Sequence, residues 1–264
     1  MSTLPISVCI ISGAEAHRIG RTLDSVAGWA AEVIVVLNDD VADGTDCLAS
    51  ERGAKVFREP WKGHVKQKNS AADKATQPWI LGLDSDEVVS PALREEIARL
   101  LASGQATSLQ AAYCFPRCSL FQGRWIRHGD WYPDRQTRLW QHGRARWGGI
   151  DPHDKIHADG PVGKLRGELL HYAAETFDQQ MRKTVLYANL FAQQCAAESR
   201  RVSFLELAVR PPWRFMRGYF LRLGFLDGWA GFCVAWMGAI YTFLRYAKAI
   251  EAQRSGEPIP PPPA

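Results

Sequence analysis

The sequence lacks the signatures of several common protein classes. Its six cysteines form no C-x-x-C pair, which argues against a zinc site or a disulfide framework and favours free thiols in a reducing compartment. It has no G-x-G-x-x-G after the first apolar run and no G-x-x-x-x-G-K-[ST], which argues against dinucleotide cofactors and P-loop chemistry. The first apolar run, Ile6–Ile11, is too short for a secretory signal and lacks a preceding basic region. We therefore expect a cytoplasmic protein.

The net positive charge of the chain comes from a segment near its C-terminus. The 264 residues carry a net charge of +4. Between Arg200 and Arg254, nine Lys and Arg residues outnumber three acidic ones, which leaves +6 there and about −2 elsewhere. A nucleic-acid-binding domain would more often spread its basic residues through the fold. The asymmetry favours a membrane surface as partner, and we expect no nucleic acid.

Short apolar runs alternate with helix-spaced apolar residues in the first part of the chain. This alternation predicts an α/β fold with right-handed βαβ crossovers, in which helices cover both faces of a mostly parallel sheet. The predicted strands are Ile6–Ile11, Glu32–Leu37, Lys55–Arg58 and Trp79–Leu83.

Polar residues follow each of these predicted strands. In parallel α/β sheets, ligands bind outside the carboxyl ends of the strands, so these segments should meet along one edge and form the binding site. The segments are Ser12–Glu15, Asn38–Asp43, Arg58–Gly63 and Asp84–Glu87.

The last of these segments contains a D-x-D pair, Asp84 and Asp86, followed by Glu87. Mg²⁺ and Mn²⁺ are commonly held by one or two carboxylates together with substrate phosphates, so the pair is a candidate metal site. Two other readings remain open at this point: an acidic surface turn, and the phosphatase signature D-x-D-x-[TV] with Asp84 as nucleophile. That signature normally closes the first strand of its fold, whereas Asp84 follows three βα units.

Tryptophan and arginine interleave between Gly123 and Gly149. Ordinary packing with solvated charges would explain this composition. Flat aromatic faces also suit the C–H faces of sugars, and arginine suits phosphate groups. The segment is therefore a candidate for binding a phosphorylated sugar.

Helices are expected after residue 175. Thr176–Ser199 has an amphipathic helical pattern. Gly228–Leu244 is an uncharged run of 17 residues, at the lower limit of roughly 17–25 for a membrane span. Its flanking arginines favour helices in the lipid headgroup region over a true span or a helical subdomain without a membrane. We expect three parts: a ligand-binding domain (1–175), membrane-interfacial helices (176–254) and a disordered Pro-rich tail (255–264).

A series of motifs, in order, resembles glycosyltransferase family 2, in particular the enzymes of the lipopolysaccharide inner-core β-1,4-glucosyltransferase type. The resemblance covers nearly all of residues 6–250, and its specificity comes from the order and spacing of the motifs. The matching residues are Val8-Cys9-Ile10-Ile11, Glu15, Asp43-Gly44-Thr45, Arg58-x-Pro60-Trp61-x-Gly63, Gln67-Lys68-Asn69-x-Ala71, Leu83-Asp84-x-Asp86-Glu87, Gly123–Gly129, Trp131-Tyr132-Pro133, Arg138-Leu139, His153-Asp154, Leu170-His171-Tyr172 and Gly224-Phe225-x-Asp227-Gly228.

The resemblance implies a GT-A-type, Rossmann-like domain and inverting, metal-dependent transfer from a nucleotide-sugar, a UDP-sugar in particular. It implies a lipid-linked or lipopolysaccharide-core saccharide as acceptor, at the cytoplasmic face of a bacterial inner membrane. Asp154 falls on the family's base position, with Asp151 as a substitute. The implied donor-binding residues are Glu15, Asn38, Asp40, Lys68, Asp84 and Ser85. The implied metal ligands, for Mg²⁺ or Mn²⁺, are Asp84 and Asp86, and the acceptor or auxiliary residues are Arg138, Trp131, His153 and His171.

The chain departs from the family pattern at donor and base positions. Asn38 stands where the family has an aspartate that contacts the nucleotide base, although Asp39 or Asp40 could compensate. Gly13-Ala14 replaces the usual Lys-Asn, and Asp154 replaces a longer glutamate. A catalytically impaired, membrane-bound protein that binds nucleotide-sugars is therefore the second functional hypothesis.

Overall fold

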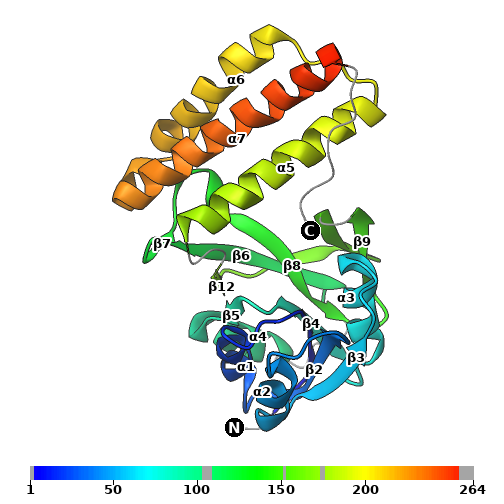
Figure 1. Cartoon of the computed structure of the whole chain (residues 1–264). Helices are drawn as coiled ribbons and strands as arrows, with labels where there is room; N and C mark the ends of the chain where they lie inside the picture. The colour runs from blue at the N-terminus through cyan, green and yellow to red at the C-terminus, as the bar shows by residue number, and fades with distance from the viewer. Residues whose placement is uncertain (1–2, 103–108, 151–152, 173–175, 256–264) are drawn as a thin grey trace. The chain divides into compact units, whose positions relative to one another are not determined.

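The computed structural model describes residues 3–102, 109–150, 153–172 and 176–255 (Figure 1). The chain forms two compact units, and each unit draws on two segments of the sequence. The first unit comprises residues up to Arg117 together with Asp134–His171. The second comprises Cys118–Pro133 and the chain from Tyr172 onward.

Four parallel strands form one half of the sheet in the first unit, in the order β3-β2-β1-β4. All four predicted strands are present, and the prediction that they pair in parallel is confirmed. Their bounds are β1 (Leu4–Ser12), β2 (Ala30–Asn38), β3 (Lys55–Glu59) and β4 (Trp79–Asp84).

The sheet as a whole is mixed, because the strands beyond β4 change direction. β8 (Asp134–Gln141) runs antiparallel to β4, and β6 (Ala112–Phe121) runs antiparallel to β8. β12 (Leu169–His171) and β5 (Glu87–Val89) continue the sheet as an antiparallel pair, and β11 (Val162–Lys164) pairs with β6. Among these later strands β6 is predicted, since Ala112–Arg117 has a strand pattern. Helical spacing does not separate the others, so the alternation that identified the parallel half could not predict them. β9 (Ala145–Ile150) and β10 (His153–Ala158) form a separate antiparallel pair.

Helices cover both faces of this sheet, as the sequence predicts. Alternate residues of β1 supply two cores: Val8 and Ile10 pack with residues of α1 and α4, whereas Cys9 and Ile11 pack with residues of α3. This division arises because successive side chains of a strand point to opposite faces of the sheet. The helices are α1 (Ile19–Val26), α2 (Thr45–Glu51), α3 (His64–Asp73) and α4 (Pro91–Ala102).

The second unit is mainly helical, and its helices α5, α6 and α7 lie side by side (Figure 1). The amphipathic pattern after residue 175 forms α5, whose N-cap Thr176 accepts a hydrogen bond from the backbone N–H of Gln179. The helical elements are α5 (Phe177–Ala197), α6 (Phe204–Met216), the π-helical turn η2 (Arg217–Leu221), the 3₁₀ turn η3 (Gly224–Asp227) and α7 (Gly228–Ser255). β7 (Arg124–Ile126) and the 3₁₀ turn η1 (Gly129–Trp131) complete the unit.

The second unit has two features that the sequence interpretation does not give. Pro211 and Pro212 lie inside α6, although each lacks the N–H that a helix interior uses. Residues 118–133, which the sequence interpretation placed within 1–175, belong to the second unit. They belong there because Phe121 and Ile126 are buried against Val234 and Met237 of α7.

Within the described residues no single helix is long and apolar enough to cross a membrane. One pair of helical segments, Phe204–Leu221 and Gly224–Ser255, meets the length and composition requirements together but is bent by 72°. The uncharged run Gly228–Leu244 forms the first part of α7.

Candidate active site

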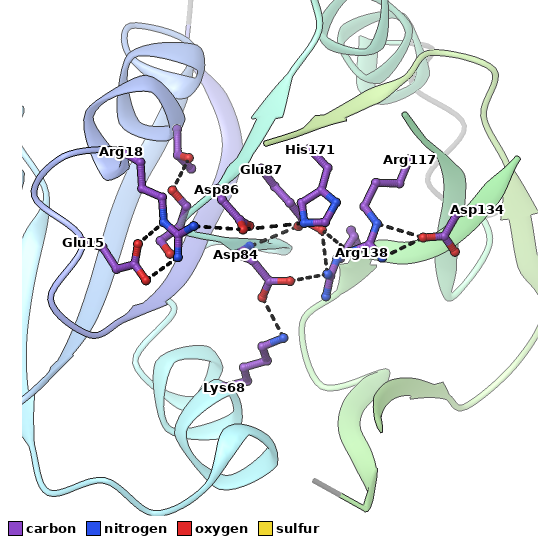
Figure 2. A network of polar contacts seen from close by, with 12 residues as sticks. Glu15, Arg18, Lys68, Asp84, Asp86, Glu87, Arg117, Asp134, Arg138 and His171 are labelled. Carbon is purple, nitrogen blue, oxygen red and sulfur yellow. Dashed lines mark hydrogen bonds and ion pairs between the residues drawn. The ribbon is translucent and has the colours of Figure 1, made fainter. Parts of the chain in front are cut away.

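Asp84 lies where the buried strand β4 ends, and both of its carboxylate oxygens contact a cationic side chain (Figure 2). Asp84 Oδ1 is 2.7 Å from Lys68 Nζ, and Oδ2 is 2.7 Å from Arg138 Nη2. Burial acts to raise the pKa of Asp84, but Arg138 and Lys68 outweigh it and hold that pKa well below its ordinary value. Asp84 is therefore an ionised carboxylate held in place from two sides.

Glu87 is a second carboxylate that contacts Arg138 next to Asp84. Its side chain is fully buried, and its Oε1 lies 2.8 Å from Arg138 Nη2 and 3.1 Å from Arg117 Nη1. Its Oε2 accepts a hydrogen bond of 3.1 Å from the backbone N–H of Asp84. Arg117 also pairs with Asp134, at 2.7 Å. Glu87 thus joins the turn after β4 to the arginines of β6 and β8.

Asp86 faces the other side of the same turn. Its Oδ2 lies 3.6 Å from His171 Nε2 and 3.7 Å from Arg18 Nη1. Arg18 in turn pairs with Glu15 in the loop after β1 (Figure 2). Burial acts to raise the pKa of Asp86, but contacts with His171 and Arg18 leave it below its ordinary value. Six of the predicted site residues therefore belong to one polar network: Glu15, Lys68, Asp84, Asp86, Arg138 and His171 (Figure 2).

Lys68 connects this network to the predicted base. Its Nζ is 2.7 Å from Asp154 Oδ2 as well as 2.7 Å from Asp84. The ammonium group also lies 4.4 Å from the ring centre of Trp147, and the guanidinium of Arg138 lies 5.0 Å from that ring. The Asn69 side chain holds Trp147 in place by donating to its carbonyl and accepting from its N–H.

The Asp43-Gly44-Thr45 motif has a structural role in this arrangement. The Asp43 carboxylate accepts hydrogen bonds from the backbone N–H groups of Ala16 and Thr45, both near 3 Å. The Thr45 hydroxyl accepts from the backbone N–H of Glu15 at 3.0 Å. The motif therefore fixes the loop that carries Glu15 and precedes Arg18.

The remaining predicted donor residues lie at the ends of β2 and β4. Asn38 ends β2, and its buried Oδ1 has no hydrogen-bond partner among the described residues. A buried acceptor without a partner is costly, so a ligand group that donates to it would be favoured. Asp40 is exposed in the following turn. Ser85 is buried, and its carbonyl accepts a 2.8 Å hydrogen bond from the Thr22 hydroxyl.

No contact in the described part of the chain assigns three of the predicted residues, Asp151, His153 and Trp131, to this network. Asp151 falls outside the described residues. His153 is the first residue of β10, where its backbone pairs with Ile150. Trp131 belongs to the second unit, where its ring packs edge-on against Phe121 with centroids 5.5 Å apart.

Sequence reasoning did not assign Arg18 or Arg117 to the site. It included Trp147 only as part of the Trp- and Arg-rich segment, and it named Glu87 only as an acidic neighbour. Arg18 and Arg117 stand in no motif, and their contacts with Asp86 and Glu87 arise only when distant segments meet. The signal for Glu87 was its place beside the D-x-D pair. Nothing local indicated that it would be buried.

The protein can supply only part of the coordination shell of a divalent ion beside Asp86. The described residues include no group of three or more His, Cys, Asp or Glu side chains that could hold an ion. Asp86 and His171 supply one carboxylate and one imidazole. Mg²⁺ and Mn²⁺ often take one or two protein ligands and complete their shell with substrate phosphate and water. The donor set therefore suits an ion that binds together with a phosphorylated ligand.

Residues 7–158 match the family model described as glycosyl transferase family 2. The chain belongs to this family. The protein is accordingly a glycosyltransferase, and the resemblance inferred from its motifs is confirmed. The phosphatase interpretation falls with this assignment, since Asp84 ends the fourth strand and both its oxygens are paired.

The relatives extend the similarity over almost the whole chain. The chain is 32% identical over 255 residues to the lipopolysaccharide core biosynthesis glycosyltransferase LpsC of Rhizobium meliloti, which covers 93% of this chain and 92% of LpsC. It is 30% identical to an uncharacterized glycosyltransferase of Rickettsia felis, over 94% of this chain and 90% of that one. Among solved structures, a Pyrobaculum calidifontis mannosyltransferase superposes with a TM-score of 0.53 at 12% identity, covering 95% and 88% of the two chains. The predicted GT-A-type fold is confirmed.

Proposed function

We propose that this glycosyltransferase moves a sugar from a nucleotide-sugar, a UDP-sugar, to a saccharide of the lipopolysaccharide core, with inversion at the transferred carbon. One observation carries the proposal: Asp84, Asp86, Lys68 and His171 converge where β4 ends. The acceptor class rests on the full-length similarity to a relative named for lipopolysaccharide core biosynthesis.

Lys68 and Arg138 suit the donor side of this reaction. Both are buried cations next to Asp84, and they would attract the negatively charged diphosphate of the donor. Each Asp84 oxygen has a second lone pair, so Asp84 can accept from ribose hydroxyls without losing its cationic partners. The unpartnered Oδ1 of Asn38 is suited to accept an N–H of the base. An asparagine at this position therefore remains compatible with base recognition.

Asp86 and His171 would hold Mg²⁺ or Mn²⁺. A bound ion would neutralise negative charge developing on the nucleoside diphosphate as it leaves. The Pyrobaculum mannosyltransferase, which shares the fold, was solved with GDP-mannose and Mn²⁺. Arg18, 3.7 Å from Asp86, adds positive charge to the same side of the turn.

Asp154 is the proposed base that takes the proton from the acceptor hydroxyl in a single displacement. Its pairing with Lys68 means that one ammonium group contacts both the base and the donor-side carboxylate, each at 2.7 Å. A diphosphate near Lys68 would compete for that ammonium and leave Asp154 freer to accept a proton. Asp154→Asn should abolish transfer while nucleotide binding persists.

The reaction is proposed to take place at the cytoplasmic face of a bacterial inner membrane, where the acceptor is lipid-linked. The bent pair of apolar helical segments in the second unit supports this location. Fractionation of cells that express the full chain tests it: the protein should sediment with membranes and be released by detergent. Recovery in the soluble fraction without detergent would refute the location but not the reaction.

A panel of nucleotide-sugars tested by thermal shift, with and without Mn²⁺, examines the donor site. We expect stabilisation by one donor class, dependent on Mn²⁺ and lost in Asp86→Ala. The matched control is Asp73→Ala, which removes an exposed carboxylate of α3 paired with Arg146. Equal stabilisation of the parent and Asp86→Ala would refute the assignment.

A further inference from the structure

The helix α6 presents an apolar stripe to solvent. Large apolar side chains that are about half exposed or more recur every three or four residues along it and into the turn η2. This spacing marks one continuous helical face. The stripe consists of Leu205 (70% exposed), Val209 (55%), Trp213 (56%), Met216 (47%) and Phe220 (47%).

The rest of the second unit adds to this exposed apolar surface. Trp229, Trp236 and Phe243 recur every seven residues along α7 and are 72%, 47% and 49% exposed. Leu221 and Leu223, in the turn between the helices, are 66% and 46% exposed. Many large apolar side chains are thus exposed within one unit, and clusters of such side chains mark binding surfaces.

Three arginines lie among these apolar residues and share one carboxylate, Asp130 of η1. Arg214 Nε is 2.5 Å from Asp130 Oδ2, and Arg217 Nη2 and Arg222 Nη1 lie 2.8 and 3.1 Å from Oδ1. Asp130 is buried, with 7% of its side chain exposed, whereas the arginine side chains are 36%, 33% and 50% exposed. One carboxylate leaves an excess of two positive charges at this Asp130 cluster.

Neighbouring charges do not compensate for this excess. Burial lowers the pKa of Arg214, and repulsion from Arg217, Arg245 and Arg222 adds to it, so the pKa lies below its ordinary value despite Asp130. Among the described residues, Asp130 is the carboxylate that pairs with these three arginines. The cluster is therefore short of negative charge.

Close backbone packing holds the cluster in shape. A Cβ on Gly231 of α7 would come within 1.9 Å of the Gly224 carbonyl, and a Cβ on Gly224 would come within 2.7 Å of the Gly218 carbonyl. The Gly129 N–H donates to the Arg222 carbonyl at 2.8 Å, which ties η1 to the turn after η2. Arginines on such a fixed turn lose little freedom when they bind an anion.

We propose that the Asp130 cluster is a binding site for the phosphate groups of anionic lipids, and that the apolar stripe of α6 and η2 enters the same bilayer surface. Arginine matches phosphate through paired N–H donors, and apolar side chains between basic ones are typical of helices that lie in the headgroup region. The positive excess selects an anionic membrane over a neutral one. This inference goes beyond the proposed sugar transfer and does not require it.

Vesicle flotation with the full chain tests the proposal. The protein should float with vesicles of phosphatidylcholine containing phosphatidylglycerol, bind vesicles of phosphatidylcholine alone much more weakly, and lose the difference as salt rises. Arg222→Gln leaves Asp130 with two guanidinium partners, so the fold should persist, and we expect about fivefold weaker binding to the anionic vesicles. Replacing all three arginines by Gln should remove the preference for anionic vesicles.

Two controls distinguish binding at this site from nonspecific electrostatic attraction and from nonspecific hydrophobic adsorption. Arg99→Gln/Arg144→Gln/Arg166→Gln removes the same charge from exposed positions of the first unit and should bind as the parent does. Leu205→Ser/Leu221→Ser should weaken binding to both kinds of vesicle, whereas Val162→Ser in the first unit should not.

Three results would overturn the proposal. Equal binding of the parent to neutral and anionic vesicles would show that the Asp130 cluster does not select anionic lipids. Unchanged binding by Arg222→Gln and the triple variant would place the preference elsewhere. A parent that remains unbound and sediments as a dimer would assign the apolar face to a second copy of the chain. Since none of these readouts is sugar transfer, they leave the proposed reaction untouched.

Discussion

A few cationic side chains balance the carboxylates at the end of β4. Arg138 is 3% exposed and contacts both Glu87, whose side chain is fully buried, and Asp84, whose side chain is 29% exposed. The sequence pointed to Asp84 and Asp86 because a strand ends there. Local patterns could not point to the cations: Lys68 and Arg138 were implied only by the family resemblance, and Arg18, which reaches the turn through the tertiary fold, was not assigned.

Arg138→Met should therefore destabilise the protein by about 3–5 kcal/mol, because it removes one of two cationic partners from both Asp84 and Glu87, and Glu87 is fully buried. Chemical unfolding of the parent and the variant measures this. Arg146→Met breaks an exposed pair with Asp73 and should cost no more than about 1 kcal/mol. Similar losses in both variants would contradict the described role of Arg138.

Glu32 predicts a pH dependence of stability. Burial would raise its pKa, but bonds from Lys55, Ser7 and Thr76 lower it to about 2. An unfolded glutamate titrates near about 4.3. Between these values the unfolded state holds more protons, so the Glu32 contribution is present above about pH 4.5 and is lost as pH falls toward 2.

Glu32→Gln should lower stability by roughly 1–3 kcal/mol at neutral pH and by progressively less as the pH falls below about 4.5. Thermal unfolding of both proteins from pH 7 to pH 3 measures the change. A difference that stays constant over this range would show that Glu32 contributes through shape and not through its charge.

At the scale of elements, local patterns gave the parallel half of the sheet and β6, and missed the other antiparallel strands. β1 to β4 show in the sequence because continuous apolar runs alternate with helices. β8, β6, β12 and β5 pair over long separations, and the Trp- and Arg-rich segment gives no strand signal. Trp140 and Trp147 were candidates for sugar binding, yet both are buried, packing edge-on at 6.0 Å over β4.

Gly82 is the residue of β4 that makes room for these tryptophans. A Cβ at Gly82 would lie 2.9 Å from Trp147 and 3.0 Å from Trp140. We expect Gly82→Ala to destabilise by about 1–3 kcal/mol through overpacking. It should also disturb the Trp147 platform under Lys68, weakening nucleotide binding.

Gly13→Ala is the control for this prediction, since the nearest atom to its Cβ would be 3.9 Å away. Denaturant unfolding of the two variants, with intrinsic tryptophan fluorescence as the signal, compares them. If Gly82→Ala proved as stable as Gly13→Ala, the close packing of the tryptophans on β4 would be wrong.

At the scale of the whole molecule, the helical unit is not a removable tail. Composition placed a boundary near residue 175, but Phe121 and Ile126 from an earlier segment are buried by α7. Composition could not indicate this, because the segment's partners follow about a hundred residues later in the sequence.

Truncation before Pro211 should therefore leave Phe121 and Ile126 without cover, and the product should aggregate. Truncation after Ser255 should leave the second unit intact. Size-exclusion chromatography in detergent, with binding of a hydrophobic dye, distinguishes the two products. A monodisperse protein from the shorter chain would contradict the two-segment organisation of the unit.

The central claim is that the carboxylates at the end of β4 support transfer of a sugar from a nucleotide donor. Its most direct measurement is the nucleoside diphosphate released from UDP-sugars when purified full-length protein meets a truncated lipopolysaccharide core, with Mn²⁺ and with chelator. The account predicts acceptor-dependent release and a sugar added to the core. Chelator should suppress this release, and Asp86→Ala should abolish it. Undiminished release by Asp86→Ala, with the sugar still transferred, would contradict it.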